Sequence, residues 1–163
     1  MKELSFATGL VSYKVNGGAE IIFNPTDTEF SKKIMGIFHD LRDKQEEYSK
    51  LLTSGDSIDP NAALDDPEAA SELINQTDAM LDAIAQMDKD MRVSIDTAFG
   101  KPGTADAVFG DLSLYAYADG LPLWANFLLA VIDEMPATAE KQAQLTDPRL
   151  RKYVGKYSSK YHN

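Results

Sequence analysis

The chain has 163 residues, of which 44% are hydrophobic, and it contains two histidines and no cysteine. Disulfide scaffolds, thiolate zinc sites and cysteine nucleophiles are therefore excluded. A Ser-His-Asp triad would need His39, in a predicted helix, or His162, the penultimate residue. We expect neither catalysis nor a bound cofactor or metal.

Charge is divided unevenly along the chain. Residues 1–140 carry 25 acidic residues and 10 Lys or Arg, whereas residues 141–163 carry one acidic and six basic residues. A body this acidic repels nucleic acid, so we do not expect a nucleic-acid partner. Residues 1–6 lack the basic segment and apolar run of a signal peptide, which predicts that the chain stays in the cytoplasm.

The first 24 residues have the pattern of a small antiparallel sheet. Apolar residues alternate with polar ones through Val11–Val15, and Asn16-Gly17 separates them from a second alternating run that ends at Phe23. Asparagine and glycine tolerate the positive φ angles of a type I′ turn, so a β-hairpin is predicted. Leu4–Thr8 is predicted to add a third strand.

A long helix is predicted to follow. Thr26 and Glu29 have the spacing of a capping box, and apolar residues recur at steps of three and four from Phe30 to Leu52, with Gly55 as the stop. Ser54–Asp66 is predicted to be a polar surface loop.

A second long helix is predicted from Pro67, with Asp66 as its cap, to Phe99, packed antiparallel on the first. Its apolar stripe resembles a heptad seam and consists of Leu73, Met80, Leu81, Ile84, Met87, Met91, Ile95 and Phe99.

A glycine-rich joint, FGKPGTADAVFGD, follows from Phe99 to Asp111. Its order differs from that of a phosphate-binding loop, so we interpret Gly100 as a helix cap and Thr104 and Gly110 as the ends of a short helix. The next segment, Leu112–Ala118, is predicted to place Leu112, Leu114, Tyr115 and Tyr117 in the core.

Leu121–Met135 is almost entirely apolar and contains the single tryptophan, Trp124. It is shorter than the roughly 20 residues that span a bilayer, so we predict a buried core or subunit-interface helix without membrane contact. Trp124, Phe127 and Leu128 are its expected core anchors.

The last residues differ in character. Ala137–Leu145 is weakly amphipathic, and Asp147-Pro148 is predicted to end its helix. Residues 149–163 form a basic tail that we expect to be flexible and to bind a protein partner, although tyrosines among basic residues would also suit stacking on nucleic-acid bases. The expected binding residues are Arg149, Arg151, Lys152, Tyr153, Lys156, Tyr157 and Lys160.

The whole pattern predicts a mainly helical α+β protein. Residues 1–148 form a single domain, with the hairpin region at 1–24 and a helical body at 26–135, and 149–163 form the tail. A lone hairpin edge and an all-apolar helix both need cover, so we expect a homo-oligomer.

Three strings, VNGGAEIIFNPTDTEF, FGKPGTADAVFGD and DLSLYAYADGLPLWANFLLAVIDEM, resemble a family of small proteins encoded among the tail genes of phages and prophages of Gram-positive bacteria. The likeness spans most of the chain. Members lie between the major tail protein and the tape-measure protein, the place of tail assembly chaperones. The resemblance implies a protein of the host bacterial cytoplasm that binds the tape-measure protein, recruits tail-tube subunits and catalyses nothing.

A second hypothesis is an acidic phage-encoded inhibitor that imitates nucleic acid and occupies a host defence protein. Such mimicry needs carboxylates on one surface at phosphate-like spacing. The candidates are Glu68, Glu72, Asp78, Asp82 and Asp96, along the second helix.

Overall fold

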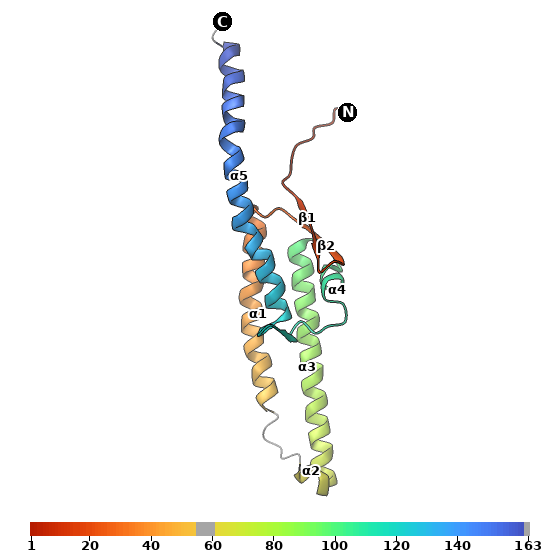
Figure 1. The fold of residues 1–163 in the computed structure, drawn as a ribbon. Helices are drawn as coiled ribbons and strands as arrows, with labels where there is room; N and C mark the ends of the chain where they lie inside the picture. Colours follow the sequence, from red (N-terminus) through yellow and green to blue (C-terminus); the bar gives the residue numbers. More distant parts are fainter. Residues whose placement is uncertain (55–60, 162–163) are drawn as a thin grey trace.

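The computed structural model describes residues 1–54 and 61–161. It is an elongated, mainly helical α+β structure, as predicted (Figure 1). Helices α1 (Thr28–Ser54) and α3 (Pro67–Phe99) run side by side in opposite directions, and the short α2 (Ala62–Asp65) lies at their far end. Helix α5 (Leu123–Tyr161) lies along the N-terminal half of α1 and continues well beyond the start of α1.

The predicted hairpin is confirmed. Strand β1 (Val11–Val15) pairs antiparallel with β2 (Ala19–Phe23), and Val15 lies opposite Ala19. Asn16 and Gly17 have φ angles of 48° and 74°, in the left-handed region that a type I′ turn requires.

The third strand predicted over Leu4–Thr8 is wrong. Residues 1–10 are exposed and form neither strand nor helix. One side-chain contact holds the end of this segment, because the Asn24 amide donates to the Thr8 carbonyl at 2.9 Å.

Helix α1 begins differently from the prediction. The Asp27 carboxylate accepts from the Glu29 N–H at 2.9 Å and caps the helix. Thr26 instead donates its hydroxyl to Asn24, at 2.7 Å, so the predicted capping box is wrong. Aspartate caps well because its charge also complements the helix dipole. The predicted stop, Gly55, lies outside the described residues.

Helix α3 begins and ends where the sequence predicts. The Asp66 carboxylate accepts from the Glu68 N–H at 3.0 Å, and Gly100 ends the helix with a φ of 64°. Its apolar stripe is buried only near the C-terminal end, where Met91 and Ile95 are inaccessible to solvent. Nearer the start of α3 the stripe is half-buried or exposed.

The joint between α3 and α5 contains α4 (Thr104–Phe109) and two short paired strands, β3 (Tyr117–Ala118) and β4 (Leu121–Pro122). Leu114 and Tyr115 are fully buried. Leu112 and Tyr117 are exposed, which corrects the expectation that all four residues enter the core. Only the middle of the segment Leu112–Ala118 therefore faces the core, and its two ends face solvent.

The core is built on one face of α5. Trp124, Phe127 and Leu128 are all buried. The Trp124 ring meets Phe38 edge to face at 5.5 Å, and its Nε1 donates to the Gln45 side chain at 3.1 Å. The helix is not buried on all sides, however, because Ala130, Asp133 and Glu134 are exposed.

The predicted helix end at Pro148 is wrong, and the two helices expected over Leu121–Met135 and Ala137–Leu145 are one, since α5 runs through Pro136 and Pro148 to Tyr161. A proline inside a helix loses one hydrogen bond and crowds the carbonyl four residues earlier. Both prolines are exposed, so water can solvate the freed carbonyls. The basic segment 149–161 is therefore a continuation of α5.

Replacement of Trp124 by alanine should be severely destabilising. Truncating a buried aromatic residue costs about 3–5 kcal/mol, a large share of the roughly 5–15 kcal/mol that stabilises a small domain. Leu145→Ala, in the same helix at a side chain that is 55% exposed, should change the free energy of unfolding by less than about 0.5 kcal/mol. Urea denaturation of both variants measures the difference, and equal stability of the two would contradict the placement of Trp124.

Candidate protein-interaction surface

Three side chains on one side of α3 hold the whole segment that connects α3 to α5. From here on, the joint means this segment, residues 100–122. Asp88, Arg92 and Asp96 are four residues apart, so they lie on successive turns. Asp88 accepts from the Leu114 N–H at 2.6 Å and from Arg92 Nε at 2.8 Å. Asp96 accepts from the N–H groups of Gly103 and Ala105, both at 2.8 Å, at the start of α4. We call these three residues the clamp.

Arg92 is the centre of the clamp. Its Nη1 donates to Asp106 at 2.8 Å and its Nη2 to the Leu112 carbonyl at 2.7 Å. Burial alone would lower the pKa of Arg92, but its hydrogen bonds to Asp88 and Asp106 and the negative charges of the two carboxylates together raise that pKa above its ordinary value. The guanidinium is therefore a permanent cation that joins α3 to two parts of the joint, α4 and the segment that follows it.

The clamp determines where α5 begins. Leu114, bound to Asp88 through its N–H, accepts from the Trp124 N–H at 3.1 Å, and the Leu123 N–H donates to the Ala116 carbonyl at 2.7 Å. The first turn of α5 is thus fixed at the level of Asp88, partway along α3. Figure 1 shows the result, because α5 starts beside the middle of α1 and leaves the lower halves of α1 and α3 as a two-helix arm.

The arm, residues 44–54 and 61–87, has an uncovered apolar surface. Ile74 and Leu81 are 59% and 53% exposed. They are seven residues apart, and Asp88 follows Leu81 by seven more, so all three lie on one side of α3. The joint covers this side at Asp88, whereas no described residue buries it at Ile74 and Leu81. We call these two residues the flank.

Acidic side chains surround the flank. Residues 61–88 contain seven aspartates and glutamates and no lysine or arginine. Asp78 is four residues after Ile74 and three before Leu81, and Asp82 follows Asp78 by one turn; both are exposed. Glu68 and Glu72 are exposed nearer the start of α3. The arm therefore offers apolar and acidic groups together.

Asp96, one of the five carboxylates expected to imitate nucleic-acid phosphates, does not belong to the exposed acidic surface of the arm. Asp96 is engaged by the backbone of Gly103 and Ala105, so its carboxylate is part of the clamp. Glu68, Glu72, Asp78 and Asp82 remain as an exposed acidic set.

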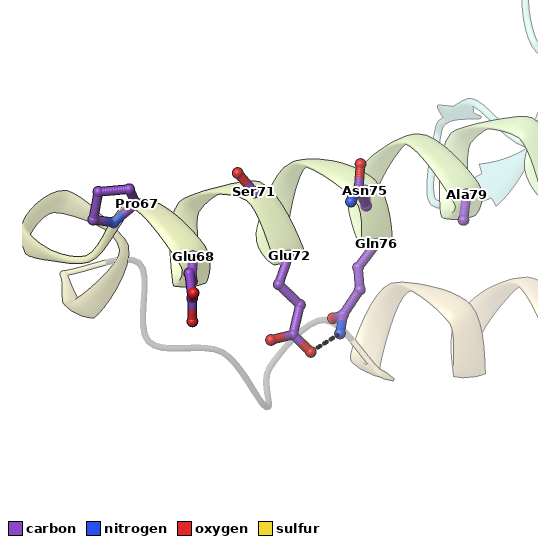
Figure 2. Close-up of a pocket in the computed structure, with 7 residues that line it drawn as sticks. All are labelled: Pro67, Glu68, Ser71, Glu72, Asn75, Gln76 and Ala79. Atoms are coloured by element: carbon purple, nitrogen blue, oxygen red, sulfur yellow. Dashed lines mark hydrogen bonds between the residues drawn. The ribbon is translucent and has the colours of Figure 1, made fainter.

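A hollow of about 710 Å³ runs along the first half of α3. Figure 2 shows that its lining comes from this one helix, with the Gln76 amide donating to the Glu72 carboxylate at 3.3 Å. A surface formed by a single helix does not enclose a small molecule. This hollow is a further part of the exposed acidic side of the arm.

The C-terminal part of α5, residues 137–161, is the second exposed surface, which we call the extension. It projects away from the arm, at the opposite end of the molecule (Figure 1). Arg151 and Lys152 are exposed. The side chains of the other expected binding residues, Arg149, Tyr153, Lys156, Tyr157 and Lys160, lie outside the described part.

The buried titratable group nearest the clamp is Tyr115. Its ring stacks on Tyr48 at 4.8 Å, and its hydroxyl has no hydrogen-bond partner among the described residues. Burial, assisted by the charges of Asp88 and Glu47, raises the pKa of Tyr115 well above its ordinary value. A phenol held neutral in this way serves packing and offers no base near neutral pH. Within residues 1–54 and 61–161, acidic and histidine side chains form no group of three suited to a metal ion.

Comparisons with models of known protein families, with curated proteins and with solved structures found no match. Among the described residues, no helix is both long enough and apolar enough to cross a membrane.

Sequence reasoning placed Leu81 in the buried seam and did not identify the flank. Ile74, Leu81 and Asp88 are spaced seven residues apart, and this interval is the signal that would have assigned Leu81 to the flank instead of the buried stripe of α3. It could be interpreted only once Asp88 was known to hold the joint.

Deletion of residues 149–163 should leave the melting temperature within a few degrees, because the described extension makes no core contact. The circular dichroism signal should fall only by the contribution of helical residues 149–161. Loss of cooperative unfolding in the truncated protein would show that the extension belongs to the core.

Proposed function

We propose that this protein is a phage tail morphogenesis factor, specifically a tail assembly chaperone. In the host bacterial cytoplasm it binds the tape-measure protein, keeps it soluble and recruits tail-tube subunits. The three sequence strings that resemble tail-gene proteins support the assignment, and the molecule's exposed helical surfaces suit a binding protein.

The flank is the observation that carries the proposal. A long helical protein such as the tape-measure protein presents apolar stripes that need cover in water. Ile74 and Leu81 lie along an exposed helix side with the same period, which suits helix-to-helix packing. Because about half of each side chain is already covered in the free protein, burying the rest of both would together contribute about 1.5–3 kcal/mol. The acidic border formed by Asp78 and Asp82 then keeps the complex soluble.

The acidic inhibitor is the second candidate. It is favoured by the exposed set Glu68, Glu72, Asp78 and Asp82 on the arm. Asp96 does not belong to this set, because its carboxylate accepts hydrogen bonds from the joint. A mimic of nucleic acid should release its partner when DNA is added, whereas a chaperone bound through apolar contacts should not.

Co-expression with the neighbouring tape-measure protein tests the proposal. The wild type should hold that protein in the supernatant and co-purify with it. Ile74→Glu with Leu81→Glu should reduce co-purification more than tenfold, since the two side chains together contribute about 1.5–3 kcal/mol, which exceeds the roughly 1.4 kcal/mol that corresponds to tenfold. Neither side chain is part of the core, so the variant should fold.

Val93→Glu is the matched control. Val93 is 61% exposed and lies in α3, but it is not at the seven-residue positions of the flank. This variant should bind as the wild type does. A tape-measure protein that stays insoluble and unbound with the wild type would refute the chaperone assignment, whereas full binding by the flank variant would refute only the site.

A further inference from the structure

The arm and the extension are complementary in charge and lie at opposite ends of the molecule. Residues 61–88 carry seven acidic residues and no lysine or arginine, whereas residues 141–163 carry six basic residues and one acidic residue. We propose that the extension of one copy docks on the arm of a second copy, against the flank. This inference concerns the protein alone and does not rest on the proposed function.

The extension cannot reach the arm of its own chain. Trp124, Phe127 and Leu128 fix the start of α5 in the core, and the helix then continues without interruption to Tyr161. At about 1.5 Å per residue the 39-residue helix is about 58 Å long. It points away from α2, so the distance to its own arm only increases along its length (Figure 1). An acidic arm can therefore be met only by the extension of another copy.

The sequence of the extension suits the flank. Leu150, Val154, Tyr157 and Tyr161 recur at steps of three and four residues, the period of one helix side. Arg149, Lys152, Lys156 and Lys160 recur with the same period, beside them. On the arm, Ile74 and Leu81 are bordered in the same manner by Asp78 and Asp82. Apolar groups would meet apolar groups while opposite charges meet along the border.

The lengths of the two surfaces also agree. Residues 67–87 of α3 span about 31 Å and residues 137–161 of α5 span about 37 Å, at about 1.5 Å per residue. Because the extension of one copy binds a different surface, the arm, on the next copy, the contact is head-to-tail. Such contacts produce closed rings or open chains, and an open chain has one free arm at one end and one free extension at the other until the assembly closes.

Charge reversal of the two surfaces tests the inference on the purified full-length protein. At low ionic strength the wild type should show a light-scattering mass of at least twice the chain mass of 17.9 kDa, rising with concentration and falling with added salt. Asp78→Lys with Asp82→Lys should reduce the mass to that of one chain. Lys152→Glu with Lys156→Glu should do the same.

Mixing these two variants should restore association, because each supplies the surface that the other lacks. An interface that joins identical patches would not be rescued in this way. Asp40→Lys with Asp43→Lys is the control of equal charge change, at exposed positions on α1 away from the flank, and it should assemble like the wild type.

Circular dichroism of each variant checks that the helices are intact. A wild type that remains a single chain at every concentration and low salt would overturn the inference. Assemblies that persist in both variants, or variants that fail to complement each other on mixing, would overturn it as well.

Discussion

The clamp of Asp88, Arg92 and Asp96 is the constraint on which the rest of the structure depends. It ties the joint to three successive turns of α3 and thereby fixes the level at which α5 enters the core. Had the joint reached further down α3, α5 could have covered Ile74 and Leu81. Because it does not, the same offset leaves the arm uncovered at one end and projects the extension at the other. Both candidate binding surfaces are consequences of one set of hydrogen bonds.

The flank connects the two proposals, self-association and partner binding. If the extension of a second copy and a tape-measure helix use the same flank, they compete, and the partner must displace a salt-sensitive contact. The flank would then be protected from nonspecific aggregation before its partner is made. Apolar burial would supply most of the stability of the proposed tape-measure complex, whereas the contact between copies would depend on the opposite charges as well.

Much of the fold follows from local signals in the sequence. Asn16-Gly17, Asp66-Pro67 and Gly100 each specify a turn or helix end through backbone chemistry, and the structure places each as predicted. Pro136 and Pro148 predicted helix ends that do not occur. Each proline costs the helix a hydrogen bond, but at exposed positions water can solvate the carbonyl that is left free, and α5 continues. The arm could not be predicted, since it depends on hydrogen bonds between residues as distant as Asp88 and Leu114.

Hydrogen exchange of the free protein, alone and with the proposed tape-measure partner added, is the most direct test that the arm is an unfilled binding surface. In the free protein, diluted and in high salt, amides of residues 67–85 should exchange much faster than those of residues 91–98 and 124–131, which hold the core. In the complex, residues 67–85 should gain protection while the core segments change little. Equal protection of arm and core in the free protein, or an arm that the partner leaves unchanged, would contradict this interpretation.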